Sequence, residues 1–337
     1  MRPMQPTSRA DAVGLMKNLN ARIAAQFTPI VLTHRRPRVA EITVRHLIDS
    51  EGVTPEEIIL VVNGEGGLED RKLQSSLDVI QIDRNSGPAN GFSVGLEYAL
   101  RNRTTEWLYL MEDDAGLLDL PVGRANRIIH DLDARLPDSA SIGAVVAYGR
   151  VFAGDSGRTV PHVPGVEAPP YAPVDVAAWG ATLIRRQVVE SGTRPDPGLF
   201  FGYEDFDFFL RLQHAGWQLV VDTAAELSVG HQVTDTGRTE VFRGQRPNEQ
   251  DEPWRHYYRA RNFLVLQRRW GNWRWLVDHL LRSLRRWQLT GWNRSVALAL
   301  ARGLFDGFRG RIGPSRRYQR KLGEFPRSGR EGGVNAR

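Results

Sequence analysis

The chain has 337 residues, of which 41% are hydrophobic and 25% are charged, proportions that are ordinary for a globular protein. It contains no cysteine, which excludes disulfide bonds and thiolate metal sites and fits a reducing compartment. The N-terminus shows no basic-then-apolar signal peptide, and no run approaches the roughly 18 apolar residues of a membrane-spanning helix. The sequence therefore favours a cytoplasmic protein with a large core, organised as one domain or two.

The net charge of +6 is unevenly distributed along the chain. Residues 254–337 hold 20 Lys/Arg and 4 Asp/Glu, whereas the preceding residues hold 25 Lys/Arg and 35 Asp/Glu. An acidic body therefore carries a strongly basic C-terminal part. Such a part indicates an anionic partner, either a membrane surface or a nucleic acid.

Apolar runs and helical patterns alternate along the first third of the chain, which predicts a mainly parallel sheet with helical crossovers. Strands are predicted at 28–33, 58–62, 79–82 and 107–111, and helices at 10–26, 39–49 and 91–101. Further along, the pattern predicts a helix at 122–136, strands at 142–148, 174–184 and 217–222, and a helix that starts near Glu204 and stops at Gly216.

Residues 151–173 are rich in Gly, Pro and Val and lack clear periodicity, which predicts a long functional or mobile loop. Three basic, aromatic helices are predicted at 254–270, 273–289 and 296–308. The polar residues 314–337 are predicted to be disordered.

The strand at 107–111 is apolar throughout and runs directly into Glu112, Asp113 and Asp114. It therefore delivers carboxylates to the carboxyl edge of the sheet, where α/β proteins bind ligands. Because side chains alternate along an extended chain, we expect Glu112 and Asp114 on one side and Asp113 on the other. Hard oxygen donors suit Mg²⁺ or Mn²⁺. A solvated acidic turn after a core strand is the alternative.

Three further features are candidates for a site. The loop from Asn85 to Gly91 leads into a helix, and glycines there let backbone N–H groups approach a phosphate, although a plain loop fits equally well. Glu204 and Asp205 start a helix, where the helix dipole favours acids, but they can also present a carboxylate to a pocket. His231 is predicted in a polar loop, where a single histidine is more often structural than a ligand.

With these motifs in this order, residues 28–270 resemble glycosyltransferase family 2, whose members are inverting sugar transferases of the GT-A fold. The loop Asn85-x-Gly-x-x-x-Gly91 with Gly95, and the motif Tyr258-x-x-Arg261-Asn262, look most like the rhamnosyl- and galactofuranosyl-transferring branch. The family's acidic motif usually reads Asp-x-Asp, whereas Glu112 stands first here.

The resemblance implies an α/β, GT-A fold with a mixed, mainly parallel sheet flanked by helices and a C-terminal helical extension. The implied organisation is a lead-in helix at 1–27, a catalytic domain at 28–250, a basic aromatic helical region at 251–313 and a disordered tail at 314–337.

The resemblance also implies a role for each matched residue. Donor binding falls to Thr33, Arg35, Asn63, Asn85, Gly87, Gly91, Glu112 and Asp113, the first three at the nucleotide base and ribose. Asp205 matches the catalytic base, with Glu204 beside it. Asp114 and His231 match ligands of Mn²⁺ or Mg²⁺, to which Glu112 also contributes. Trp179 and Gly180 match the wall between the donor and acceptor pockets.

The implied donor is a UDP- or dTDP-linked sugar such as galactofuranose or rhamnose, and the implied acceptor is a saccharide or polyprenyl-linked saccharide in cell-envelope glycan synthesis. The cation would stabilise the departing diphosphate, and a carboxylate on the opposite face would take the acceptor's proton. A retaining hydrolase, which needs two carboxylates about 5 Å apart, gives no reason for the acidic metal motif.

The competing hypothesis is a non-catalytic protein that binds a membrane or a nucleic acid through its basic helices. Trp and Leu share helical faces there, which is typical of burial or of an interfacial helix rather than a base-stacking platform, so we expect no nucleic-acid partner. Either the helices hold the protein peripherally on the inner face of the plasma membrane, or the same apolar faces form a helical subdomain or a homodimer.

Overall fold

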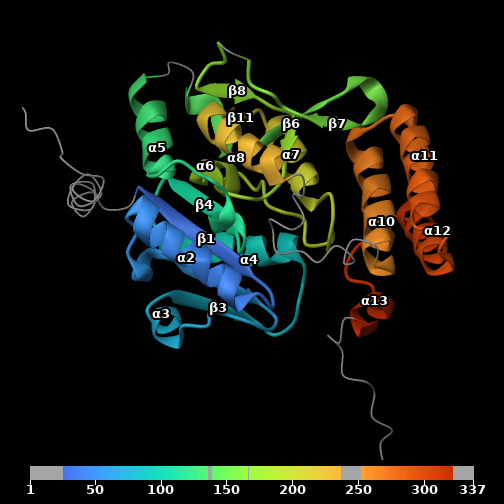
Figure 1. Cartoon of the computed structure of the whole chain (residues 1–337), viewed down its shortest axis with the longest axis horizontal. Helices are drawn as coiled ribbons and strands as arrows, with labels where there is room; N and C mark the ends of the chain where they lie inside the picture. Colours follow the sequence, from blue (N-terminus) through green and yellow to red (C-terminus); the bar gives the residue numbers. More distant parts are fainter. Residues whose placement is uncertain (1–25, 136–138, 166, 237–251, 322–337) are drawn as a thin grey trace, which may run out of the picture.

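The computed structural model describes residues 26–135, 139–165, 167–236 and 252–321. It confirms the α/β class: one large, mainly parallel sheet is flanked by helices, and a helical region follows at the C-terminal end (Figure 1). The strand order is β3-β2-β1-β4-β10-β5-β11-β8. These strands are β1 (Phe27–Thr33), β2 (Ile59–Asn63), β3 (Asp78–Ile82), β4 (Trp107–Glu112), β5 (Ile142–Val146), β8 (Tyr171–Pro173), β10 (Thr182–Arg185) and β11 (Gln218–Asp222).

The first four of these strands are parallel to one another, as the alternation of strands and helices predicts. Strand β10 then pairs antiparallel between β4 and β5, and β8 closes the sheet as an antiparallel edge strand. Strands β1, β2 and β4 are almost entirely buried, which explains their continuous apolar sequences. Their carboxyl ends lie at one edge, so Thr33, Asn63 and Glu112 end neighbouring strands.

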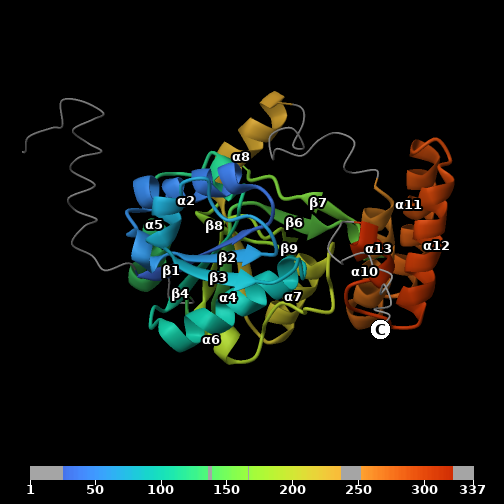
Figure 2. The same cartoon turned by 90° about the horizontal axis from the view of Figure 1, so that it is seen from below.

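Helices cover both faces of the sheet (Figures 1 and 2). One core forms between the sheet and α2 (Pro37–Glu51), α5 (Arg124–Arg135) and α8 (Thr223–Thr236). The other forms beneath α4 (Pro88–Asn102), α6 (Arg186–Glu190) and α7 (Glu204–His214). The short helix α3 (Arg71–Ser75) precedes β3.

Two glycines allow α4 to lie unusually close to the sheet. A Cβ atom on Gly91 would come within 2.4 Å of Leu32 Cδ1, and one on Gly95 within 2.6 Å of Ile30 Cγ2. Gly91 was expected at the helix entrance, but it lies inside α4, one turn from its start. Its place in the fold is therefore explained by helix–sheet packing rather than by close approach of the backbone to a phosphate.

The segment predicted as a long irregular loop, 151–173, contains strands instead. Part of β6 (Gly149–Phe152), β7 (Thr159–Pro161) and β8 lie within it, and β6 pairs with β7 and β9 (Val176–Ala177) in a small antiparallel sheet. The continuous strand predicted at 174–184 is also wrong, because β9 and β10 are separated by the bend that carries Trp179 and Gly180. Strands of two or three residues are too short to show an alternating pattern.

The C-terminal helices α10 (Pro253–Trp270), α11 (Trp273–Leu289) and α12 (Arg294–Phe308) pack beside the sheet domain, close to the predicted bounds (Figure 2). Residues 316–321, predicted to be disordered, form the helix α13 (Arg316–Lys321), whose Tyr318 is buried with its ring centroid 4.7 Å from that of Tyr257. The lead-in helix predicted at 10–26 falls almost wholly outside the described residues, and so do residues 322–337 of the predicted tail.

Candidate active site

The acidic end of β4 forms a cluster around one arginine. The side chains of Asp113 and Asp114 are 2% and 6% exposed. Arg36, at the start of α2, donates from Nε to Asp113 Oδ2 at 3.1 Å and from Nη1 to Asp114 Oδ2 at 3.1 Å. The expected pairing of Glu112 with Asp114, opposite Asp113, is therefore wrong. The chain leaves the extended conformation at Asp114 (φ −98°, ψ 2°), so strand alternation no longer holds there.

Burial sets the electrostatics of this cluster. It raises the pKa of Asp113 to about 7, because water no longer solvates the carboxylate; the charge of Asp114 adds to the rise and that of Arg36 opposes it. Two buried carboxylates side by side attract a cation strongly. The guanidinium of Arg36 is the cation that the described residues place there.

Arg36, which the sequence analysis did not name, therefore reaches the acids. Arg35, predicted at the nucleotide base and ribose, has a left-handed backbone conformation (φ 57°) and pairs with the exposed Glu65 at 3.1 Å. Thr33, predicted at the same place, donates its hydroxyl to Asp113 Oδ2 at 3.2 Å. No local signal distinguishes Arg36 from Arg35, because Pro37 fixes only the first turn of α2.

Asn63 holds the loop that follows β3. Its amide nitrogen donates to Gly87 O at 3.1 Å, and its amide oxygen accepts from the backbone N–H and the hydroxyl of Ser86, both at 2.9 Å. Asn85 closes the same turn by accepting from Gly87 N at 2.9 Å. The side chains of Asn63 and Asn85, both predicted to bind the donor, thus hold this loop in shape through their hydrogen bonds.

Gly87 joins this loop to the chain that leads into α7. Its φ is +85°, and a Cβ atom would lie only 2.1 Å from Phe200 O. No other residue fits there without moving the backbone. The predicted donor loop and the predicted catalytic segment are therefore adjacent in the fold, although more than a hundred residues separate them in sequence.

Glu204 and Asp205 start α7, as predicted, directly after Tyr203 in a left-handed conformation (φ 68°). Glu204 is 5% exposed, and its Oε2 has no hydrogen-bond partner among the described residues. Burial raises the pKa of Glu204 well above its usual value, and the charges of Asp205 and Glu112 raise it further. The charge of Glu112 acts on Glu204, so the end of β4 lies near the start of α7.

Asp207, the third acid of this helix start, has a structural role. It is fully buried and accepts from Arg211 Nε at 2.8 Å, Arg269 Nη1 at 3.0 Å and Trp270 Nε1 at 3.1 Å. These bonds tie α7 to α10 and occupy both carboxylate oxygens. Asp207 is thus not available to a substrate.

The motif Tyr258-x-x-Arg261-Asn262 positions the same helix start. Asn262 Nδ2 donates to Phe201 O and Gly202 O, both at 2.9 Å. Arg261, 1% exposed, donates from Nη2 to Gly198 O at 3.3 Å. From the sequence this motif was only a family marker. In the structure it holds the segment 198–202, which carries the chain into Glu204.

Trp179 is a core residue rather than the wall of a pocket. It is 2% exposed, and its ring centroid lies 5.1 Å from that of Phe92 and 5.2 Å from that of Phe208. Its ring packs against α4 and α7, so it can affect the site only by positioning these helices. The neighbouring Gly180 packs against Tyr148, whose hydroxyl would lie 3.1 Å from an added Cβ.

His231 lies in α8 rather than in the predicted loop, and its side chain is outside the described part of the structure. Within the described ranges, no group of three or more His, Cys, Asp or Glu residues has the arrangement of a metal site. The donor chemistry nevertheless fits Mn²⁺ or Mg²⁺, since such ions are commonly held by one or two carboxylates plus phosphate oxygens and water. Asp113 and Asp114 supply such a pair, now neutralised by Arg36.

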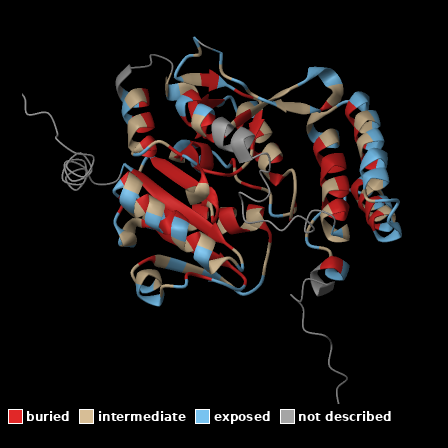
Figure 3. Cartoon of the chain, viewed as in Figure 1, coloured by how far each residue is buried: buried red, intermediate tan, exposed pale blue. Residues whose placement is uncertain are grey.

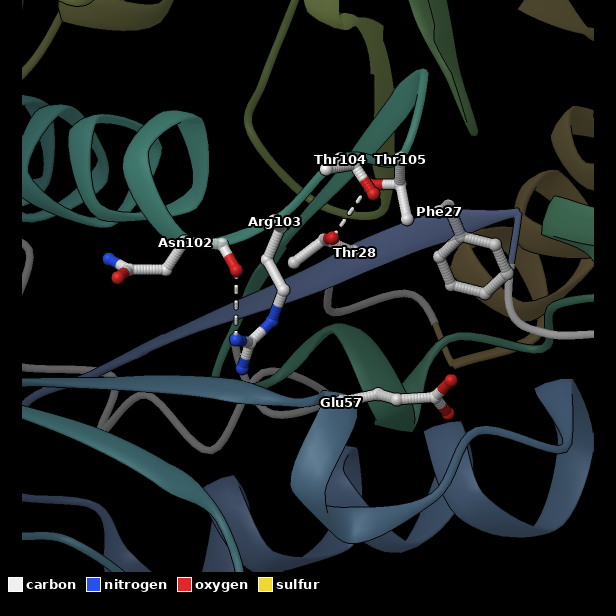
Figure 4. Close-up of a pocket in the computed structure, with 7 residues that line it drawn as sticks. All are labelled: Phe27, Thr28, Glu57, Asn102, Arg103, Thr104 and Thr105. Atoms are coloured by element: carbon white, nitrogen blue, oxygen red, sulfur yellow. Dashed lines mark hydrogen bonds between the residues drawn. The ribbon is translucent and has the colours of Figure 1, made fainter.

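A separate cavity lies at the opposite edge of the sheet, at the amino ends of β1 and β4 (Figure 4). Its polar groups are already paired: Thr28 and Thr105 share a hydrogen bond of 2.7 Å, and Arg103 forms an ion pair with Asp78 at 2.7 Å. Because ligands of α/β sheets bind at the carboxyl ends of the strands, we place the site at the acidic cluster instead.

Fold and site together define an α/β protein with two sets of carboxylates at the carboxyl edge of its sheet. No family model matches the sequence, and the comparison with curated proteins returns no match. Among solved structures, the chain is similar to GalNAc-T7 with UDP, GalNAc and Mn²⁺, at 16% identity and a TM-score of 0.42, over 58% of this chain and 41% of that one. The chain thus spans less than half the length of that protein.

The chain is also similar to the mannosyltransferase PcManGT from Pyrobaculum calidifontis in complex with GDP-Man and Mn²⁺. Here the identity is 14% and the TM-score 0.40, over 88% of this chain and 94% of that one. Likenesses at these levels leave the function to be argued from the site itself.

Proposed function

We propose that the chain is a glycosyltransferase of the GT-A fold that moves a sugar, with inversion, from a nucleotide-sugar donor to a saccharide or lipid-linked saccharide. The observation that carries this proposal is the nearness of two carboxylate sets. Asp113 and Asp114 sit at the end of β4, and Glu204 and Asp205 at the start of α7. Gly87, which Asn63 at the end of β2 holds, packs against Phe200, four residues before Glu204. One set suits a cation and diphosphate, and the other suits a proton acceptor.

The β4 set would hold the donor. Asp114, together with Asp113 or Glu112, would ligate a divalent cation, which supplies positive charge to the departing diphosphate. Arg36 already contacts both aspartates and lies beside the same oxygens. A guanidinium there can bond phosphate oxygens when the aspartates turn to another cation.

The α7 set would handle the proton. Two adjacent carboxylates in a buried site favour sharing one proton, because a second negative charge there is costly. We assign that proton to the more buried Glu204, whose pKa is raised by burial and by the neighbouring charge of Asp205. Asp205 is then ionised. It takes the proton of the acceptor hydroxyl while the oxygen of that hydroxyl bonds to the anomeric carbon. The bond to the diphosphate breaks on the opposite face, with its electron pair leaving on the diphosphate.

A donor screen tests this proposal. We expect the purified protein to bind and slowly hydrolyse at least one UDP-, dTDP- or GDP-sugar with Mn²⁺ or Mg²⁺ present, and not with EDTA. The galactofuranose and rhamnose donors indicated by the sequence come first in the screen. Failure to bind or hydrolyse any nucleotide sugar with either cation would remove the proposed function.

The helix α11 carries a stripe that favours a membrane-bound acceptor. Much of α11 is exposed to solvent (Figure 3). Its exposed apolar residues recur at helical spacing, which places them on one face, and are Trp273, Val277, Leu280, Leu281 and Leu284. Arg285, and Arg274, which also pairs with Asp155, lie along one side of this stripe on the exposed surface. A second copy meeting the same stripe would bring these arginines together, whereas an anionic lipid surface complements them. We therefore propose peripheral membrane binding in place of a homodimer. No helix in the described parts of the chain is long and apolar enough to cross a bilayer.

Vesicle flotation tests this surface. We expect the full chain to float with phosphatidylglycerol vesicles at low salt, less so at high salt, and not with phosphatidylcholine alone. Replacing Leu281 and Leu284 with glutamate should abolish flotation, whereas Val163→Glu, at an even more exposed apolar residue of the sheet domain, should not. A chain that stays in solution with anionic vesicles and sediments as a dimer would show that the stripe is an assembly interface.

A further inference from the structure

A second cluster of cationic side chains lies outside the acidic site, between α10 and α11. A cavity there is lined by Tyr203, His256, Arg259, His279, Arg282 and Arg286. Tyr203 is the residue that immediately precedes Glu204. The side chains of α11 that line it recur at helical spacing, on the face opposite the apolar stripe of the same helix.

The charge of this cavity is only partly compensated. Arg282 forms an ion pair with Asp278 at 2.5 Å, but neither Arg259 nor Arg286 pairs with an acid among the described residues. Burial lowers the pKa of Arg259, and the positive charges of Arg286 and Arg255 lower it further. Guanidinium groups that repel one another at a cavity are stabilised by a bound anion.

A buried, unsatisfied histidine also points to a ligand. His279 is 6% exposed, and its Nε2 has no hydrogen-bond partner among the described residues. Its ring stacks on Phe263, with centroids 4.1 Å apart and planes at 14°, so the ring cannot easily turn away. Burial lowers the pKa of His279 to about 3, and the charge of Arg282 lowers it further, which keeps the imidazole neutral while the cavity holds no anion.

The cavity lies next to the turn that leads into α7. A Cβ atom on Gly202 would come within 3.2 Å of Arg259 Cγ, so the stem of Arg259 lies against the turn that leads into Glu204. The charge of Glu204 also acts on Arg259. A ligand in the cavity would therefore lie on the α7 side of the site, away from Asp113 and Asp114.

We infer that Arg259, Arg282, Arg286 and His279 form a subsite for a phosphate or diphosphate ester carried by the acceptor. This inference rests on the proposed function, and it specifies the acceptor as a sugar linked to a phosphorylated lipid. Arginine forks match phosphate oxygens in geometry and charge. The same helix presents its apolar stripe on the opposite face, so about 10 Å, the width of one helix, separates the subsite from the surface where a lipid would end.

Calorimetric titration of the full chain in EDTA tests the subsite without any sugar transfer. The probes are geranyl diphosphate, geraniol and inorganic pyrophosphate. We expect geranyl diphosphate to bind, and Arg259→Gln and Arg286→Gln each to weaken its Kd by about 10-fold or more, the usual value of a charge-assisted hydrogen bond. Arg294→Gln, at an exposed arginine of α12 outside the cavity, should leave Kd unchanged.

Equal binding to the wild type and the Arg286→Gln variant would overturn the subsite. Arg286 is exposed, so its replacement does not disturb the core, and any loss of binding reports on the cavity. Binding of geraniol as tight as that of its diphosphate would overturn it as well. Arginine-dependent binding of pyrophosphate as tight as that of geranyl diphosphate would overturn the assignment to a lipid-linked acceptor. Because EDTA removes divalent cations and no nucleotide sugar is present, these outcomes are independent of the donor screen.

Discussion

Replacing Asp205 with asparagine should lower turnover at least ~10²-fold, the lower range for a positioned proton acceptor, and leave nucleotide-sugar binding nearly unchanged. Asparagine keeps the size of the side chain and can still accept the hydrogen bond from Phe206 N, which measures 2.8 Å. It cannot take the proton of the acceptor hydroxyl. Steady-state kinetics at saturating donor, together with donor Kd from titration, separate the two effects.

Glu204→Gln is the informative comparison. If Glu204 holds the shared proton, its neutral carboxyl group resembles an amide, and the variant should retain much more activity than Asp205→Asn. Glu190→Gln, at an acid of α6 that forms a partly exposed ion pair with Arg186, serves as a control for loss of charge alone. Wild-type turnover in Asp205→Asn, with a large loss in Glu204→Gln, would transfer the role of base to Glu204.

The sequence correctly predicted those features that depend on a single strand or helix. Strands β1, β2 and β4 are buried on both faces, so their apolar runs were unambiguous. The start of α7 at Glu204 and the end of the helix before Gly216, with φ +91°, follow from local helix signals. These predictions need no knowledge of which elements become neighbours.

The sequence was misleading where the role of a residue depends on a distant partner. Arg36 and Asp113 are 77 residues apart, so nothing local favours Arg36 over Arg35 as the partner of the acids. Asn63 was expected to bind the donor, but its hydrogen bonds go to Ser86 and Gly87 on the neighbouring loop. Trp179 was expected at a pocket wall, but α4 and α7 close over it. Tertiary packing decides each of these.

Cation binding by Asp113 and Asp114 can be tested by a substitution that leaves the fold intact. Asp114 is 6% exposed and shares Arg36 with Asp113, and Arg36 itself remains one-third exposed to solvent. Removing one of the two carboxylate charges should therefore leave Arg36 paired with Asp113. The thermal unfolding midpoint should change by only a few degrees, because ~1 kcal/mol shifts a domain of this size by roughly 2–4 °C.

Asp114→Asn should nevertheless reduce cation-dependent turnover at least ~100-fold, since a bound cation contributes several kcal/mol to the departing charge and ~1.4 kcal/mol is a factor of ten. The amide keeps the shape of the carboxylate but lacks its charge, and Mn²⁺ or Mg²⁺ prefers charged oxygen ligands. Mn²⁺ affinity is measured by calorimetry with and without UDP, next to Asp119→Asn, an exposed acid five residues further along. Unchanged Mn²⁺ affinity in Asp114→Asn would place the cation elsewhere and leave Arg36 as the group that neutralises the donor diphosphate.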